Sequence, residues 1–565
     1  RYYLQANGKA KSGWFKQNGY WYYGAENSNE NLLKGAMESG IRKIDEHSYY
    51  FDGNYRLATG WKLIGGVRYF FNTDANPEKC NLLYSGPIFS GWFEFEDGGK
   101  AYINLQGNPV TGWQTIGGKK YYFDANGIMQ TGWYTIGGVD YLFDSDGVNI
   151  PVKDPTATSA VISDCYIVSG SRTGGIKVRL QASLSDLIRS ADEKFYIVET
   201  ESYGNVIDLD TPVAVIEKDL EIDTTFIIDA GDGSEVVREC VDQAIMNKFA
   251  LAVLKNDGNY QVISTPMGIT NPEVIAENQT ATFKAHSKKG IQGILYAKDY
   301  DKQVILTAED GNTKHTLFNI SIKDHISNGA KDGFISYQYK GKTYYFSDFA
   351  DLKGNVKSLN KGYSQWLYGE KGPKHKVAVT FCLLLEYSSS RSYLIDPAAR
   401  QSGHKYYTLN VREEQGRETY EAFFHYMGEV FGQEDCYVTN WILGNEVNSS
   451  RAWNYQGSLS QDAYMQCYAA AFRLLYNGVK TAKSGNNVFI SLDNGWIAAP
   501  DTYSGKSTLD KFAAYAQKEN KDMLWSIAWH GYSYPLTKCD FWNDNTNTTF
   551  STSTKYISMK NISVL

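Results

Sequence analysis

The sequence predicts a multidomain protein: β-hairpin solenoid repeats, then a β-sandwich, then an α/β domain of the (β/α)8-barrel type. Three patterns lead to this prediction, namely an aromatic repeat, runs of alternating apolar residues, and buried strands that alternate with amphipathic helices. A chain of 565 residues is also too long for one hydrophobic core. We expect the three domains at 1–150, 151–285 and 286–565.

The first domain contains repeats that are clearest at 111–130 and 131–150. These copies read TGWQTIGGKKYYFDANGIMQ and TGWYTIGGVDYLFDSDGVNI. Each copy predicts a strand with Trp, a Gly-Gly turn and a Tyr-rich strand, which together make a hairpin. A single hairpin cannot bury its aromatic side chains, so neighbouring hairpins are expected to stack into a solenoid.

These copies resemble the cell-wall-binding repeats, of the choline-binding and glucan-binding type, of surface proteins from Gram-positive bacteria. The resemblance implies that aromatic rings bind a polysaccharide or cell-wall glycan, either a glucan or a choline-decorated teichoic acid. Only the segment WYY at 21–23 has the Trp-Tyr-Tyr run usual in choline-binding copies, which favours a glucan. The expected ligand-binding residues are Trp14, Trp21, Trp61, Trp92, Trp113, Trp133 and Tyr122. Alternatively, these tryptophans only hold the solenoid together.

The second domain begins after PVKDPTATSA (151–160), a change of composition that predicts a linker. Between 160 and 285, runs such as GIKVRLQASL and EKFYIVETES alternate apolar and polar residues, which predicts a β-sandwich. The segment at 237–264 breaks this rhythm and receives no assignment. Such a domain either binds sugar or acts as a spacer, and no site residue is visible in it.

The third domain alternates apolar strands with amphipathic helices, which predicts a buried parallel sheet. Six strand-helix units in succession favour a barrel over a doubly wound sheet, and no G-x-G-x-x-G motif follows a strand. Helices are expected at 416–432, 460–482 and 507–520. Strands are expected at 290–297, 314–320, 376–388, 436–446, 487–493 and 523–532.

Polar residues stand at the carboxyl ends of these strands, which is where the active sites of (β/α)8 barrels lie. Glu446 follows the fourth strand, in the segment WILGNE. Asn319, Glu386, Asp493 and His530 stand at the ends of the second, third, fifth and sixth strands. We therefore expect these side chains to share one rim, with Glu446 near the aromatic residues Trp441 and Trp453.

The ending Asn445-Glu446 resembles the end of strand four in the clan of retaining glycoside hydrolases with (β/α)8 barrels. The resemblance implies that Glu446 is the catalytic acid/base and that Asn445 holds a sugar hydroxyl. The segment WHGYSYP (529–535) is similar to the clan position that orients the nucleophile, which adds His530 and Tyr532. Glu386 and Asn319 are expected to bind substrate. Trp529 either stacks on a sugar ring or belongs to the core.

Residues 265–565 contain the segments ITNPEVIAEN, KHTLFNI, GNEVNSS and YISMKNISVL. Through these segments the region resembles an uncharacterised barrel family of gut bacteria, a domain of unknown function assigned to glycosidases by similarity. Retaining hydrolysis needs a second carboxylate about 5–5.5 Å from the first, and in the clan it ends strand seven. We expect that strand beyond Leu565, and we do not assign Glu386 or Asp493 as nucleophile. Because the chain also starts within a repeat, a fragment truncated at both ends is expected.

Composition narrows the functional classes further. The net charge of −7 disfavours a nucleic-acid partner, and the seven scattered cysteines suggest neither a disulfide framework nor a metal site. No run of 18 apolar residues predicts a membrane span, and no cofactor motif is present. The expected protein is secreted and surface-associated, and it hydrolyses glycosidic bonds. The alternatives are a non-catalytic carbohydrate-binding adhesin and a structural surface-layer component with an inert barrel.

Overall fold

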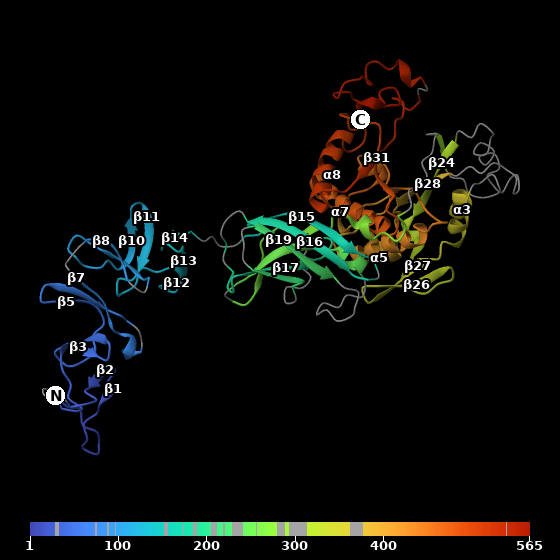
Figure 1. Cartoon of the computed structure of the whole chain (residues 1–565). Helices are drawn as coiled ribbons and strands as arrows, with labels where there is room; N and C mark the ends of the chain where they lie inside the picture. Colours follow the sequence, from blue (N-terminus) through green and yellow to red (C-terminus); the bar gives the residue numbers. More distant parts are fainter. Residues whose placement is uncertain are drawn as a thin grey trace. The chain divides into compact units, whose positions relative to one another are not determined.

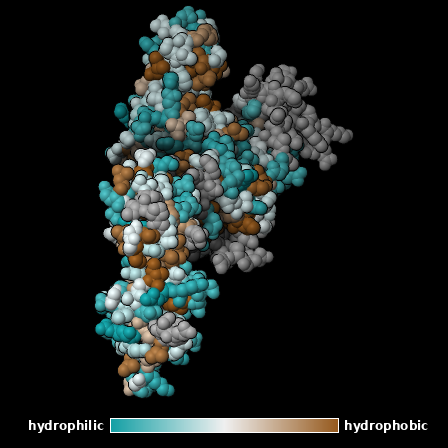
Figure 2. Space-filling model, turned by 60° about the vertical axis from the view of Figure 1, so that its left-hand side comes forward, coloured by the Kyte–Doolittle hydropathy of each residue, from teal (hydrophilic) through white to brown (hydrophobic). Residues whose placement is uncertain are grey.

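A computed structural model of the chain describes most residues and divides them into two compact units, Arg1–Lys153 and Asp154–Leu565 (Figure 1). The described residues are 1–28, 33–73, 76–86, 90–95, 98–151, 156–172, 174–184, 188, 190–204, 212–217, 221–228, 241–255, 257–279, 289–292, 313–361, 377–537 and 540–565. On the face shown in Figure 2, hydrophilic and hydrophobic residues are interspersed. Within the described residues, no helix is both long and apolar enough to span a bilayer.

The first unit is a series of small antiparallel sheets, most of them two-stranded hairpins, as the repeat predicts. In β10 (Gly112–Ile116) and β11 (Lys119–Phe123), Trp113 pairs with Tyr122 across the hairpin. The turn between them uses Gly117 and Gly118, both at positive φ, as a two-residue hairpin loop requires. The other strands are β1 (Gly13–Gln17), β2 (Tyr20–Gly24), β3 (Gly40–Ile44), β4 (His47–Phe51), β5 (Gly60–Ile64), β6 (Val67–Phe71), β7 (Leu82–Gly86), β8 (Gly91–Glu94), β9 (Lys100–Ile103), β12 (Gly132–Ile136), β13 (Val139–Phe143) and β14 (Asn149–Ile150).

Tryptophan side chains join successive hairpins of this unit. The ring of Trp113 lies 5.4 Å from Tyr122 in its own hairpin and 4.8 Å from Tyr141 in the next one. Edge contacts of this kind stabilise aromatic pairs beyond simple burial. The same arrangement recurs for Trp14 with Tyr23 and Tyr49, and for Trp92 with Tyr102 and Tyr121. The aromatic residues of the repeat therefore form the core between hairpins.

The second unit begins with two antiparallel sheets that share one hydrophobic cluster. One sheet has the order β15 (Ala160–Gly170), β16 (Ile176–Leu184) and β19 (Glu221–Ile228). The other sheet has the order β18 (Ala214–Glu217), β17 (Lys194–Thr200), β20 (Lys248–Leu254) and β21 (Tyr260–Val262), and β22 (Met267–Gly268) pairs with β20. Alternate residues of β16, namely Ile176, Val178 and Leu180, are buried, as period-two patterning predicts. The segment left without assignment supplies β20, β21 and the short helix α1 (Val241–Met246).

The C-terminal part holds a six-stranded parallel sheet in which neighbours in the chain are neighbours in space. Its order is β23 (Lys289–Gln292), β24 (Thr313–Ser321), β28 (Ala378–Leu384), β29 (Asn440–Leu443), β30 (Asn487–Leu492) and β31 (Trp525–Trp529). All five pairings are parallel. The six strands expected from the sequence are thus confirmed, although 293–297 lie outside the described residues. The pairings of the described residues form an open row, not a closed barrel.

Helices cover one face of this sheet, where apolar strand residues such as Phe381, Trp441 and Ile490 join the largest hydrophobic cluster. The main helices are α3 (Ala350–Lys361), α5 (Glu414–Phe431), α7 (Gln461–Lys480) and α8 (Gly505–Glu519), with α6 (Ser450–Trp453) as a single turn. The last three main helices confirm the expected helical segments. A small antiparallel sheet of β25 (Ile326–Ser327), β27 (Lys342–Ser347) and β26 (Phe334–Tyr339) follows β24. This insertion was not expected from the sequence.

A buried arginine of α7 holds the middle sheets against the C-terminal helices. The Arg473 guanidinium is fully buried and donates hydrogen bonds to the carbonyl oxygens of Ile245, Met246 and Asn247 at 2.6–3.0 Å. Asn477, one turn later, donates to the carbonyl of Ile245 at 2.8 Å. Burial lowers the pKa of Arg473, and these carbonyls supply the acceptors that a buried charge requires.

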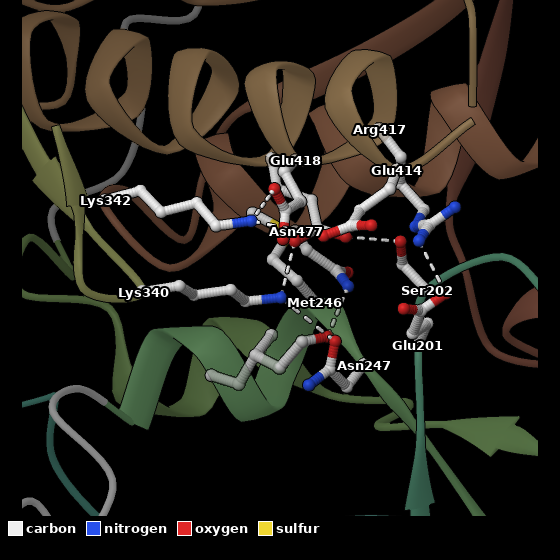
Figure 3. A network of polar contacts seen from close by, with 12 residues as sticks. Glu201, Ser202, Met246, Asn247, Lys340, Lys342, Glu414, Arg417, Glu418 and Asn477 are labelled. Atoms are coloured by element: carbon white, nitrogen blue, oxygen red, sulfur yellow. Dashed lines mark hydrogen bonds and ion pairs between the residues drawn. The ribbon is translucent and has the colours of Figure 1, made fainter. Parts of the chain in front are cut away.

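The helix α5 makes a second polar contact with the middle sheets (Figure 3). Arg417 pairs with Glu201, and Glu421 accepts hydrogen bonds from Ser202 and from Lys340 of the β26–β27 turn. Arg417 and Glu421 are four residues apart and so lie on one face of the helix. The two sheets and the C-terminal part thus form one compact unit, which agrees with the boundary at Asp154.

Candidate active site

Glu446 lies just beyond the carboxyl end of β29 and is 7% exposed. Its φ of 45° is in the left-handed region, and Gly444 two residues earlier has a φ of 73°. This conformation costs a residue with a side chain about 1–2 kcal/mol and persists only where the surroundings hold it. Here the Glu446 amide donates to Ser491 Oγ at 3.2 Å, and the Val447 amide donates to the Ser491 carbonyl at 2.9 Å.

A histidine from the sixth strand meets this carboxylate. His530 Nδ1 lies 2.7 Å from Glu446 Oε1, and Tyr532 Oη lies 3.0 Å from the same nitrogen. On the other side of the ring, His530 Nε2 is 3.3 Å from Ser491 Oγ. Burial and the charge of Glu446 raise the pKa of Tyr532 to about 12. A carboxyl and an imidazole at this distance form a hydrogen bond, which fixes the orientation of the Glu446 side chain.

Asp493, at the end of β30, is a second buried carboxylate at this rim. Its oxygens accept hydrogen bonds from Asn448 Nδ2 at 2.6 Å, from Ser449 Oγ, and from the Gly495 amide at 2.8 Å. Burial raises the pKa of Asp493, and the charge of Glu446 acts in the same direction. Because its oxygens are already bonded to the loop that carries Glu446, Asp493 organises that loop.

The other rim residues lie in the same region without a direct bond to Glu446 in the described structure. Asn445 is half-buried immediately before it, and Asn319 is exposed at the end of β24. Glu386 is half-buried beyond β28 and accepts a hydrogen bond from Ser321 Oγ at 2.6 Å. Parallel register brings Asn319 opposite Cys382, so the second and third strands end side by side, as the sequence predicts.

Two tryptophans face away from the carboxylate cluster. Trp441 is fully buried on the helix side of the sheet, with its ring 5.4 Å from Phe381, so the expectation that it flanks Glu446 is wrong. Trp529 packs in the same helix-side cluster and donates through Nε1 to the Ile557 carbonyl at 2.9 Å. Side chains alternate along a strand, and Ala528 and His530 take the opposite face. Trp529 therefore anchors the C-terminal segment and does not join the cluster.

Aromatic residues do stand at the rim, beyond the third and fourth strands. Tyr406 packs on Cys382, Leu384 and Ile442 of the sheet face without helices. Its ring lies 6.2 Å from that of Trp453, which is 37% exposed. The same sheet face contains a hollow of about 310 Å³ lined by residues of all strands, among them Leu317 and Phe489.

Tyr406 and Ser491 were not among the site residues expected from the sequence. Ser491 lies two residues after Phe489 on one face of β30, so period-two alternation would have directed it toward Glu446. Tyr406 lies in a long irregular segment and carried no pattern that could have identified it. Among the described residues, no group of three or more His, Cys, Asp or Glu side chains could hold a metal ion.

The repeat tryptophans contact neighbouring aromatic rings in most cases. Trp61 lies 5.0 Å from Phe70 and 5.8 Å from Tyr84, and Trp92 remains 44% exposed. Lys16 Nζ lies 5.7 Å from the ring of Trp21, and Trp133 is half-buried. Exposed rings held by neighbouring rings can pack a hairpin array and also present a face to a ligand.

Two family models match the chain. The model of a family of unknown function (DUF5722) covers residues 281–565, and that of the choline-binding repeat covers residues 110–146. A comparison with curated proteins gives no match. The repeat model agrees with the expected cell-wall-binding repeats.

Several solved structures are similar to parts of the chain. CbpJ from Streptococcus pneumoniae TIGR4 is 27% identical, covering 30% of this chain and 52% of its own, with a TM-score of 0.14. Choline binding protein F from Streptococcus pneumoniae, in the presence of a peptidoglycan analogue, is 27% identical. The match covers 26% of this chain and 43% of that protein, with a TM-score of 0.13. Truncated alternansucrase from Leuconostoc mesenteroides is 16% identical. The match covers 38% of this chain and 17% of that protein, with a TM-score of 0.14. The chain thus spans about half the length of the choline-binding proteins that it matches.

Proposed function

This chain belongs to the family of unknown function DUF5722, and we propose that its C-terminal part is a glycoside hydrolase in which Glu446 is the acid/base. The observation that carries the proposal is the pair of Glu446 and His530, 2.7 Å apart at the shared carboxyl ends of β29 and β31. Cleavage of a glycoside requires a proton at the leaving oxygen, and a positioned carboxylic acid supplies it.

The surroundings of Glu446 support this role. It is buried to 7% exposure with a left-handed φ of 45°, a strained conformation of the kind that collects at functional sites. His530 Nδ1 and the Tyr532 hydroxyl contact the Glu446 carboxylate and hold it in place. Asn445 would hold a sugar hydroxyl beside the scissile bond. Tyr406 and Trp453, 6.2 Å apart at the rim, offer aromatic surface to sugar rings.

Only the acid/base is assigned here. Asp493 already accepts hydrogen bonds from Asn448 and Ser449 of the loop that carries Glu446 and from the Gly495 amide, and Glu386 accepts one from Ser321. Neither is proposed as the nucleophile.

The test uses the full-length protein and compares wild type with Glu446→Gln on two substrates that share a sugar but differ in leaving group. General acid catalysis typically contributes about 10²–10⁴-fold, so kcat/KM on an unactivated oligosaccharide should fall by that factor. The fall should be much smaller on a nitrophenyl glycoside, whose leaving group needs little protonation. Glu434→Gln is the matched control, because Glu434 is exposed on the loop before β29, at the opposite end of the strand.

The rival role is carbohydrate binding without cleavage. If wild type and Glu446→Gln both bind oligosaccharide and neither turns it over, the domain is a binding module. Equal losses on both substrates would remove Glu446 as the general acid.

The repeats support a second role, attachment to a cell-surface glycan that carries choline. The observation in favour is the match of residues 110–146 to the choline-binding repeat, together with tryptophans such as Trp92 that join hairpins and stay exposed. A quaternary ammonium is attracted to such aromatic faces. Retention of the chain on choline-bearing resin, with elution by free choline, tests this role. Retention on a dextran resin instead would favour a glucan. Trp92→Ala tests whether this ring takes part in retention, and Leu105→Ala, at an exposed position, is its control.

A further inference from the structure

A pocket of about 720 Å³ lies away from Glu446, between the inserted sheet, the segment after β28 and the first turns of α5. Its volume is within the range of small-molecule sites, about 300–1,000 Å³. The lining comes from three separate parts of the chain, represented by Asn328, Tyr393 and Glu418. A pocket assembled in this way has a shape set by tertiary packing.

Charged residues form one wall of this pocket, and their contacts are drawn in Figure 3. Lys342 Nζ lies 2.6 Å from Glu418 Oε2 and 3.2 Å from Glu414 Oε1. Glu414 and Glu418 are one helical turn apart on α5, while Arg417 and Glu421 point to the middle sheets and hold the helix there. Two carboxylates share one ammonium, so the wall has an excess of negative charge. A phosphate, a nucleotide or another anion would be repelled.

The remaining lining combines aromatic rings with hydroxyl and amide groups. Tyr393 Oη donates to Asn328 Oδ1 at 3.2 Å, and Asn328 Nδ2 donates to the Ser390 carbonyl at 2.9 Å. The lining also includes the hydroxyl groups of Ser327 and Thr343 and the amide of Gln415. A ligand rich in hydroxyl groups would make the bonds that these side chains offer.

We propose that this pocket binds a neutral oligosaccharide, at a site separate from the Glu446 cluster. Sugar rings present both apolar faces, which suit tyrosine rings, and hydroxyl groups, which bond to carboxylates and amides. The segment that follows Glu386 leads from the rim of the parallel sheet to Ser390 and Tyr393 of the pocket. One segment therefore contributes residues to the rim and to the pocket. The pocket does not depend on the catalytic role of Glu446.

The experiment measures binding by calorimetry in the full chain carrying Glu446→Gln, which keeps the titrated sugar intact. The probes are maltopentaose, cellopentaose and chitopentaose, with choline chloride and inorganic phosphate as charged alternatives. Ser390→Trp fills the pocket from an exposed position, and Ser389→Trp places the same bulk on the neighbouring exposed residue outside the lining. Gln415→Ala removes a polar group of the lining while favouring the helix, and it remains informative if Ser390→Trp folds poorly.

The expected result is a sugar-binding component that weakens at least tenfold in Ser390→Trp and in Gln415→Ala but is unchanged in Ser389→Trp. Binding by the repeats contributes equally to all variants. The proposal is overturned if no sugar shows such a component, or if only choline or only phosphate does, since that would make the ligand charged. Turnover of a nitrophenyl glycoside in the Ser390→Trp chain with native Glu446 reports on the catalytic site separately.

Discussion

His530 Nδ1 lies 2.7 Å from Glu446 Oε1 across 84 positions of sequence. The two residues follow strands separated only by β30 in the sheet. The contact therefore exists because parallel strands deliver their carboxyl ends to one edge.

Removing the imidazole should lower turnover without abolishing it. A hydrogen bond to a charged group contributes about 1.5–3 kcal/mol, so His530→Leu is expected to reduce kcat about 10- to 100-fold. His530→Asn should retain more activity, because its amide nitrogen can replace Nδ1 as a donor to Glu446. Steady-state kinetics of both variants on one glycoside check this. Equal activity of the leucine and asparagine variants would count against the hydrogen bond.

The backbone at position 446 should be measurably strained. Glu446→Ala and Glu446→Gly both delete the carboxylate, but only glycine adopts a φ of 45° without steric cost. The glycine variant should be more stable than the alanine variant by about 1 kcal/mol. Urea unfolding of the pair measures the difference. A more stable alanine variant, as in an ordinary strand or helix, would contradict the left-handed conformation.

Arg473→Met should destabilise the second unit strongly. The substitution leaves three buried carbonyl groups without their donor, and each unsatisfied group costs about 1–3 kcal/mol. We expect a loss of several kcal/mol in the free energy of unfolding, read from the urea midpoint. Lys511→Ala is the control, because it removes only an exposed ion pair with Asp462, worth about 0–1 kcal/mol. Similar small losses in both variants would show that the buried contacts contribute little.

Stability should fall at high pH partly through Tyr532. Its pKa rises from 10.0 to about 12 through burial and the charge of Glu446, so the folded chain holds the phenolic proton more tightly than the unfolded chain. The stabilisation is complete below pH 10 and is lost as the pH rises toward about 12. Tyr532→Phe should therefore lose less stability than wild type over this interval. Parallel curves for the two proteins would argue against the shift.

Much of the C-terminal fold could be predicted from the sequence because hydrophobic period and length are local properties. The run at 487–493 becomes β30, and the pattern at 460–482 becomes α7. Strand order placed Glu446 and His530 at one edge, and the structure brings them into contact. A strand buried on both faces, in contrast, does not reveal which residues point toward the helices. Trp441 was assigned to the wrong face for this reason.

Features that depend on distant parts of the chain were not predictable. The sheet of β25, β26 and β27 packs against α5 through Phe346 and Phe423. No local sequence pattern predicts that contact. The bonds of Arg473 to carbonyls near residue 246 join segments more than 200 positions apart. Such pairings follow from tertiary packing alone.

The fully buried guanidinium of α7 has a consequence for how the chain can be divided. The stretch matched by the family model begins at residue 281, whereas the acceptors of Arg473 belong to residues 245–247. A polypeptide limited to the matched stretch would therefore lack all three carbonyl groups that accept hydrogen bonds from this charge. An expression boundary that keeps those partners has to lie before residue 245.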